Sequence, residues 1–431
     1  MEYFPYIVVG AGAAGLVVAS GLAKAGKQVL LVDGGEEYFG CAASKALIAS
    51  AKTAHSIRMA KEFGIEIPKC DLSCDGALKR TRKIVSEMRK KEEPAALKKL
   101  GIDTIKGTAS FIDAHTIAVY DEEDNETLFH GKTFIIATGS SPKIPDIKGL
   151  ERSSFSTIET VCDLKKVPKT LAILGGGKVG CELAQAFSRL GAQVHLFEKK
   201  KKLLPSEEPE VQKLVANFLE KEGIHLHFGA SITKIEDLLC DHLVITTGRT
   251  PHIKHLNLDA AGVRYKEKTI DIDECGKTAQ NHIWAIHDFI GSENQARAIL
   301  ASLLSSWNKK YTKQAVTRIT YTDPEIASIG LKQKQAEKLF GKHKVSVYSL
   351  PLSDPLSEGV IKIVTKKRGS KILGATIVSE RAGEMIMEIA TAMHDKTSLS
   401  KLLDLIHPQE THNDAISKTA DLHFMETLVK R

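Results

Sequence analysis

The segment Tyr6–Asp33, YIVVGAGAAGLVVASGLAKAGKQVLLVD, decides the fold of this 431-residue chain. An apolar run leads into Gly10, Gly12 and Gly15, a helix-forming stretch follows, and a second apolar run ends at Asp33. In such a unit the first glycine permits a tight turn, the second lets the backbone approach a pyrophosphate, and the third lets the helix pack on the strand. The segment therefore predicts a strand–helix–strand unit that binds a dinucleotide.

A second copy of this pattern lies at Leu171–Glu198, LAILGGGKVGCELAQAFSRLGAQVHLFE, with its glycines at Gly175, Gly177 and Gly180. Asp33 lies 23 residues after Gly10, and Glu198 lies 23 residues after Gly175. A single glycine pattern is weak evidence, but two complete copies predict two dinucleotide sites.

The acid that ends each copy indicates which nucleotide binds. Asp33 and Glu198 are placed to accept a hydrogen bond from a ribose 2′-hydroxyl, and a carboxylate would repel a 2′-phosphate. The second site is therefore expected to prefer NADH. The block Lys199–Lys202 directly follows Glu198 and could meet a 2′-phosphate, so NADPH remains the alternative.

The composition excludes several classes of protein. Hydrophobic residues make up 42% and charged residues 26%, which is typical of a folded globular chain and excludes disorder. No apolar run reaches the length of a membrane span, and the N-terminus has no secretory leader, so a cytoplasmic protein is expected. The net charge is +7, but only 6% of residues are aromatic and no nucleic-acid motif is present, so nucleic acid is not an expected partner.

The seven cysteines are odd in number and scattered, which argues against structural disulfides. The histidines are spread along the chain, and Cys70 and Cys74 lack a partner pair, so no metal site is expected.

Further motifs occur in order along the chain: GTASF at 107–111, FIIATGSSPKIP at 134–145, TTGRTPH at 246–252, IWAIHD at 283–288 and YTDPEIASIGL at 321–331. With the two glycine-rich units, they make the chain resemble the pyridine nucleotide-disulfide oxidoreductases, the family of dihydrolipoamide dehydrogenase, glutathione reductase and mercuric reductase. The resemblance implies an α/β fold with two Rossmann-like dinucleotide-binding domains and a C-terminal α+β dimerisation domain.

Carried over to this chain, the resemblance implies FAD binding by residues 1–149 and 265–313, NAD(P)H binding by 150–264, and a homodimer interface in 314–431. It implies that FAD contacts Ala109, Thr138, Gly139 and Asp288 besides the first glycine-rich turn. The family pattern adds Gly248 and Arg249 to the cofactor-binding set. Lys45 is expected near the flavin edge, facing Glu182, where the pair can position a nicotinamide.

The first departure from the family is at its redox centre. The family reads approximately GGTCLNVGCIPSK, whereas residues 34–45 read GGEEYFGCAASK. Cys41 matches the flavin-proximal cysteine, but Glu36 stands where the family has the cysteine that attacks an external disulfide.

The second departure is near the C-terminus, where the family reads approximately IHAHPTLSEAL and residues 406–416 read IHPQETHNDAI. Without gaps, Gln409 replaces the acid/base histidine, and Asp414 replaces the acid that orients it. In a shifted alignment His407 is the base, with Glu410 or Asp414 as its partner.

Smaller departures affect the second nucleotide domain. Lys178 occupies the place of a common aromatic lid, and only 50 residues separate Glu198 from Gly248. The β-meander that the family carries in this interval is therefore expected to be trimmed.

Three functions remain open. The leading hypothesis is an FAD enzyme that passes electrons from NADH to a small acceptor other than a disulfide, such as a quinone, a dye or a metal ion. The second is a reductase or peroxidase that depends on Cys41 alone. The third is a catalytically retired flavin-binding interaction protein. The sequence does not identify the acceptor.

Overall fold

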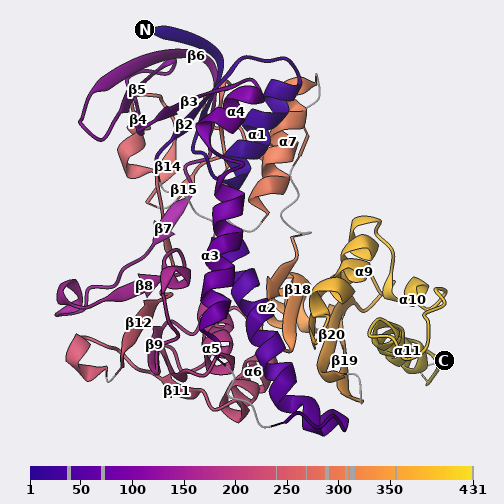
Figure 1. Cartoon of the computed structure of the whole chain (residues 1–431). Helices are drawn as coiled ribbons and strands as arrows, with labels where there is room; N and C mark the ends of the chain where they lie inside the picture. The colour runs from indigo at the N-terminus through magenta and orange to yellow at the C-terminus, as the bar shows by residue number, and fades with distance from the viewer. Residues whose placement is uncertain are drawn as a thin grey trace. The chain divides into compact units, whose positions relative to one another are not determined.

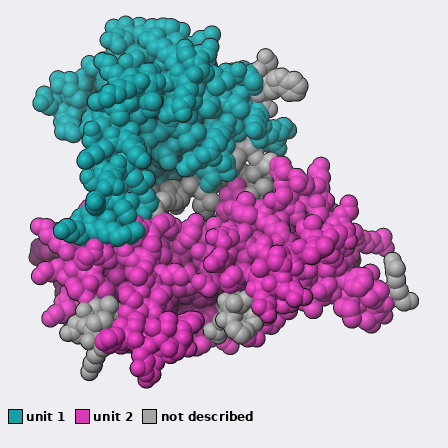
Figure 2. Space-filling model, turned by 45° about the vertical axis from the view of Figure 1, so that its right-hand side comes forward, with its two compact units in different colours: residues 1–43, 79–145, 248–312 teal, residues 44–78, 146–247, 313–431 magenta. Residues whose placement is uncertain are grey.

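The computed structural model describes residues 1–35, 40–68, 73–238, 240–267, 269–286, 291–305, 309–310, 316–354 and 357–429. The chain forms two compact units, coloured teal and magenta in Figure 2. Unit 1 comprises residues 1–43, 79–145 and 248–312, and unit 2 comprises residues 44–78, 146–247 and 313–431.

Unit 1 is built on a seven-stranded sheet of order β3-β2-β1-β6-β5-β4, with β16 also paired to β6. β4 and β5 are antiparallel to their neighbours, and the other strands are parallel. The strands are β1 (Glu2–Val9), β2 (Val29–Asp33), β3 (Ile102–Lys106), β4 (Thr108–Phe111), β5 (Thr116–Tyr120), β6 (Glu126–Ile136) and β16 (Ile283–Ala285). Shorter pairs join β7 (Ser140–Pro142) to β13 (Arg249–Pro251) and β14 (Tyr265–Lys266) to β15 (Thr269–Ile270).

The central parallel strands of unit 1 are apolar where both faces of the sheet are covered. Ile7 and Val8, adjacent in β1, face opposite sides and are both fully buried. Helices α1 (Ala13–Lys24) and α7 (Ser292–Leu304) lie side by side on the Val8 face (Figure 1). Their close approach requires Gly21, since a Cβ there would lie 2.1 Å from Leu300 Cδ2.

Three helices complete the first part of the chain: α2 (Gly40–Met59), α3 (Asp75–Arg89) and α4 (Pro94–Lys99). None of the described helices is both long enough and apolar enough to cross a membrane.

Unit 2 contains a second parallel sheet of order β11-β10-β9-β12-β8. Its strands are β8 (Phe155–Thr157), β9 (Thr170–Leu174), β10 (Gln193–Glu198), β11 (His225–Phe228) and β12 (His242–Ile245), and its helices are α5 (Lys178–Arg189) and α6 (Pro209–Lys221). The described residues between β11 and β12 form no strand, only a short helical turn and one isolated bridge. This connection is as short as the spacing from Glu198 to Gly248 predicts.

Unit 2 also contains an antiparallel sheet of order β17-β18-β21-β20-β19. The strands are β17 (Arg318–Thr320), β18 (Glu325–Gly330), β19 (Val345–Asp354), β20 (Ser357–Lys366) and β21 (Ile372–Ser379), and the helices are α8 (Gln333–Phe340), α9 (Ala382–His394), α10 (Leu399–Leu402) and α11 (Asp414–Val429). Ile386 of α9 and Ile416 of α11 join the buried core of this sheet. The predicted fold class, two dinucleotide-binding sheets plus a C-terminal α+β part, is confirmed.

Candidate functional site

The first glycine-rich turn, in unit 1, has the geometry that its sequence predicts. Gly10 has a φ of 114°, and a Cβ on it would lie 2.3 Å from the oxygen of Ala137. A Cβ on Gly15 would lie 1.9 Å from the oxygen of Gly10, so the fold itself requires both glycines. A Cβ on Gly12 would meet nothing within 4 Å. The packing of the protein therefore does not require a glycine at position 12. The lack of a side chain there leaves open space above the turn.

The N-terminus of α1 beside this space can receive an anion. Gly12 is its N-cap, no side chain caps it, and its first turn carries no acid. Unpaired N–H groups and the helix dipole favour a phosphate there.

Other predicted residues of unit 1 lie on the strands and loops around this turn. Asp33 ends β2 and accepts a hydrogen bond at Oδ1 from Gly35 N at 3.0 Å. Thr138 Oγ1 donates to the oxygen of His252 at 2.7 Å. Gly139 has a φ of 68°, and its oxygen accepts from His252 N at 3.1 Å. The methyl group of Ala109 is buried in the core, so only its backbone is left to face a ligand.

Gly248 and Arg249 lie where β13 pairs with β7. Gly248 has a φ of 118°, and its oxygen accepts from Lys143 N at 2.8 Å. Arg249 Nε donates to Ser140 Oγ at 2.8 Å, and its guanidinium also donates to the oxygen of Ser140. Asp288, the other residue predicted for this unit, lies outside the described residues.

The second glycine-rich turn, in unit 2, repeats the geometry of the first. A Cβ on Gly175 would lie 2.6 Å from the oxygen of Thr246, and a Cβ on Gly180 would lie 1.8 Å from the oxygen of Gly175. A Cβ on Gly177 would again meet nothing within 4 Å. The N-terminus of α5 has no side-chain cap and no acid, and its first residue is Lys178. The two turns thus share one geometry, and the second adds the cation Lys178.

Glu198 is fixed against the second turn by backbone amides. Its Oε2 accepts from Gly176 N and its Oε1 accepts from Lys200 N, both at 2.8 Å, and the residue is 8% exposed. Each carboxylate oxygen keeps a further lone pair for a ligand. The lysines Lys199–Lys202 that follow are exposed.

Lys45 and Glu182 are brought together as predicted. Lys45 Nζ of α2 lies 2.8 Å from Glu182 Oε2 of α5, and the side chains are 36% and 4% exposed. Glu182 Oε1 accepts from Tyr321 N at 2.9 Å, and Lys45 Nζ lies 3.8 Å from the centroid of the Tyr321 ring. Tyr321 was not among the predicted site residues, although it opens the motif YTDPEIASIGL. Lys178 Nζ lies 5.9 Å from the same ring.

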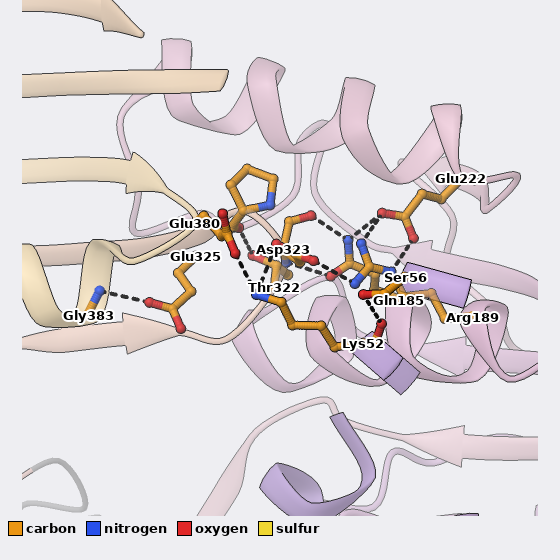
Figure 3. A network of polar contacts seen from close by, with 11 residues as sticks. Lys52, Ser56, Gln185, Arg189, Glu222, Thr322, Asp323, Glu325, Glu380 and Gly383 are labelled. Atoms are coloured by element: carbon orange, nitrogen blue, oxygen red, sulfur yellow. Dashed lines mark hydrogen bonds and ion pairs between the residues drawn. The ribbon is translucent and has the colours of Figure 1, made fainter. Parts of the chain in front are cut away.

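Beyond Glu182, the next turns of α5 carry Gln185 and Arg189, which belong to a network of polar contacts (Figure 3). Gln185 and Asp323 exchange two hydrogen bonds: Gln185 Oε1 accepts from Asp323 N at 2.7 Å, and Gln185 Nε2 donates to the oxygen of Asp323 at 2.8 Å. Arg189 donates twice to Glu222 at 2.7 Å and once to Asp323 at 2.8 Å. Successive turns of α5 are thereby tied to residues 321–323, which hold Tyr321 against Glu182.

A pocket in unit 2 opens beside this network, and its lining includes Lys52, Glu182, Tyr321, Asp323 and Glu325. Burial raises the pKa of Glu325, against the opposing effect of the hydrogen bond that it accepts from Gly383 N. The pocket therefore places charged groups of both signs beside the apolar side chains of Ile48, Ala51 and Ala186.

The C-terminal region gives His407 a different partner from either predicted one. His407 Nε2 lies 2.9 Å from Glu388 Oε1, and the His407 side chain is 8% exposed. Asn413 Nδ2 holds the other oxygen of Glu388 at 2.8 Å. The carboxylate of Asp414 pairs instead with Lys418 at 2.8 Å. In the described structure, Glu388 is thus the acid that orients His407.

The redox centre is described only in part. Glu36 and the side chain of Cys41 lie outside the described residues, and Cys41 precedes Lys45 by one turn of α2. Among the described thiols, burial raises the pKa of Cys181 and of Cys240, which disfavours the reactive thiolate.

Comparison with known proteins explains this arrangement. Residues 4–303 match the pyridine nucleotide-disulphide oxidoreductase family, and residues 316–420 match its dimerisation domain. The chain belongs to this family. Its members are flavoenzymes that use FAD and a nicotinamide nucleotide, so the chain is an oxidoreductase of this class.

Named relatives span almost the whole chain. It is 29% identical to mercuric reductase of Lysinibacillus sphaericus over 100% of this chain and 84% of the relative. It is also 29% identical to dihydrolipoyl dehydrogenase of Bacillus subtilis, covering 96% and 98% of the two chains. Among solved structures, it is similar to the HOCl-induced flavoprotein disulfide reductase RclA from Escherichia coli, with a TM-score of 0.83, 25% identity, and coverage of 97% and 100%.

The residues of this family member fit both nucleotides. Each glycine-rich turn leaves an open space at an uncapped helix N-terminus, above Gly12 and above Gly177. Each turn also has an acid at the end of the following strand, Asp33 or Glu198. These are the features that a pyrophosphate and a ribose require.

Proposed function

We propose that this chain is an FAD-dependent NADH oxidoreductase that delivers electrons to an acceptor other than a disulfide. The acceptor would be a quinone, a dye or a metal ion. The observation that carries the proposal is the joint replacement of two family residues, the attacking cysteine by Glu36 and the acid/base histidine by Gln409. Opening a disulfide needs a thiolate and a base that generates it, and this chain has neither at its family position.

The described side chains support this proposal. Both ring nitrogens of His407 are already engaged, Nε2 with Glu388 Oε1 at 2.9 Å and Nδ1 with the oxygen of Leu405 at 3.2 Å, so His407 is poorly placed to replace the missing base. Cys162 and Cys181 are buried, and the pKa of Cys181 is raised, so neither resembles an attacking thiol.

The donor is assigned as NADH rather than NADPH. The carboxylate of Glu198 lies at the second turn and is held there by two backbone amides. A 2′-phosphate would be repelled by this charge, whereas a ribose hydroxyl could donate to it. The exposed lysines Lys199–Lys202 could bind a 2′-phosphate. NADPH must therefore be compared directly with NADH as the electron donor.

Each predicted residue has an assigned role. Unit 1 would hold FAD at the following residues: Gly10, Gly12, Gly15, Asp33, Ala109, Thr138, Gly139 and Asp288, with Gly248 and Arg249 supporting the loop. Unit 2 would hold NADH at Gly175, Gly177, Gly180 and Glu198. Bound FAD supplies hydride acceptance and onward electron transfer. Lys45 and Glu182 would position the nicotinamide, and Cys41 would lie at the flavin.

The resemblance to the family also implies a division into domains. Residues 1–149 and 265–313 would form the FAD domain, 150–264 the NADH domain and 314–431 the interface of a homodimer. The match of residues 316–420 to the family's dimerisation domain supports the homodimer.

The test is an anaerobic assay of the purified holoenzyme with NADH and a panel of acceptors. With a quinone, NADH and one proton should yield NAD⁺ and the hydroquinone in a one-to-one ratio. Lipoamide and glutathione disulfide should give almost no turnover. Brisk turnover with a disulfide would contradict the proposal, and absence of flavin reduction by NADH would favour the retired-enzyme alternative.

A further inference from the structure

Three histidines lie together on one face of the parallel sheet of unit 2. His225 and His227 are two residues apart on β11, and His195 of the neighbouring β10 is paired in register with His225. Side chains of alternate strand residues share a face. Val194 and Leu196 of β10 are buried on the opposite face, so the histidines point away from that core.

Two of the imidazoles face each other through their ring nitrogens. His195 Nδ1 lies 3.1 Å from His227 Nε2, and the ring centroids are 5.4 Å apart. Two nitrogens that bind one Zn²⁺ at tetrahedral angles lie about 3.4 Å apart, given Zn–N bonds of about 2.0 to 2.1 Å. The observed contact is a hydrogen bond in which the two nitrogens point at each other, so both rings must turn slightly before one ion can bind the two nitrogens.

Another histidine pair in the molecule lacks this feature. His115 and His282 in unit 1 stack with centroids 4.1 Å apart. However, His115 Nδ1 contacts the oxygen of Gly131 at 3.1 Å, and His282 Nε2 contacts the oxygen of Ala114 at 2.7 Å. Each of these rings directs one nitrogen at a backbone carbonyl, whereas His195 and His227 direct theirs at each other.

The surroundings of His195 and His227 leave both rings accessible. Both side chains remain half-buried, and His225 is exposed, so an ion could reach them.

The short connection between β11 and β12 packs beside the histidines. Its residues Ile232 and Leu238 join an apolar cluster that includes Phe197 of β10. Phe197 in turn stacks on His227, with centroids 4.4 Å apart. The pair thus lies at the border of a packed apolar cluster, with one side of each ring supported.

We infer that His195 Nδ1 and His227 Nε2 chelate one divalent transition-metal ion of the Zn²⁺, Cu²⁺ or Ni²⁺ class. In the described structure, no group of three or more His, Cys, Asp or Glu side chains is placed to hold a metal, so water completes the coordination. Binding requires the hydrogen between the two nitrogens to move to the outer nitrogen of the same ring. The site is independent of the proposed electron acceptor.

The experiment titrates Zn²⁺ into oxidised, tag-free holoenzyme whose accessible thiols are blocked with N-ethylmaleimide, using calorimetry. One Zn²⁺ per chain is expected, and His195→Gln or His227→Gln should each weaken binding at least about tenfold, because the chelate is lost. The matched controls His225→Gln and His282→Gln should change the affinity less than about twofold. Equal losses for all four variants, or none for the first two, would overturn the inference.

Pulsed EPR of Cu²⁺ bound to the unaltered protein provides a measurement that does not depend on the folding of a variant. Two imidazole nitrogens should be coupled to the ion. A spectrum with one imidazole, or with thiolate ligation alone, would overturn the inference.

Discussion

Arg189 Nη1 lies 2.8 Å from Asp323 Oδ2, although the two residues are 134 positions apart in the chain. Arg189 ends α5, the helix that begins at the second glycine-rich turn, and Asp323 lies in the turn before β18. The same guanidinium donates two hydrogen bonds to Glu222. This pairing fixes residues 321–323 along α5, and hence Tyr321 beside Glu182 and Lys45.

We predict that Arg189→Met destabilises unit 2. The Arg189 side chain is 6% exposed, and its loss would leave two carboxylates without their cation, which costs about 3 kcal/mol for a buried pair. Urea unfolding followed by circular dichroism would measure the loss. Arg381→Met is the control, because the Arg381–Glu384 pair is exposed and should contribute less than about 1 kcal/mol. Similar losses for both variants would refute this role of Arg189.

We predict that Gly12→Val gives a folded protein without FAD. Its added Cβ meets no protein atom within 4 Å, so the side chain should occupy only the space left for the pyrophosphate. Absorbance near the flavin maximum, relative to protein, measures the bound cofactor. Gly76→Val is the matched control, since a Cβ there also meets nothing within 4 Å. If the Gly12→Val protein kept its bound flavin, the assignment of this turn to FAD would be wrong.

Arg189 and Gly12 illustrate which features of this fold the sequence predicts and which it does not. Gly12 and Gly177 follow from a local pattern, because turn, helix N-terminus and acid lie within one short segment. The partners of Arg189 and of His407 could not be predicted, because Asp323 and Glu388 reach them only through the packing of separate elements. The same limit applies to His195 and His227: they are 32 positions apart in the chain, and only the pairing of β10 with β11 brings them together.

We predict that Glu198→Arg shifts the preferred donor from NADH towards NADPH. The change removes a repulsive charge and adds a partner for a 2′-phosphate. The ratio of kcat/KM for the two donors is the measurement. Because Glu198 also accepts from Gly176 N and Lys200 N, Glu198→Gln serves as a control for disturbance of this loop. If the unaltered enzyme already prefers NADPH, the exposed lysines outweigh the acid.

We predict that Lys45→Gln slows flavin reduction by NADH, measured by anaerobic stopped flow, at least about tenfold. It removes the cation from Glu182, a nearly buried carboxylate that is also bonded to Tyr321. Lys52→Gln, on the same helix, is the control, because Lys52 makes only longer contacts to Asp323 and Glu380, at 3.7 and 3.4 Å. If the two changes slowed flavin reduction equally, the total positive charge on α2, and not the Lys45–Glu182 pair, would control this step.

Finally, we predict that no single substitution restores disulfide reduction. Glu36→Cys supplies a nucleophile without the base that activates it, and Gln409→His supplies a base without its thiol. Such groups act as a unit, so their effects are strongly non-additive. The double variant Glu36→Cys with Gln409→His should be the first to reduce lipoamide, whereas quinone turnover, which needs neither group, should persist in all three variants. His407→Gln tests the competing assignment: it should leave quinone turnover unchanged and lower the melting temperature, since it removes one of the two side chains that hold Glu388. If His407→Gln instead abolished an existing disulfide activity, His407 would be the base, and Gln409 would not mark a lost function.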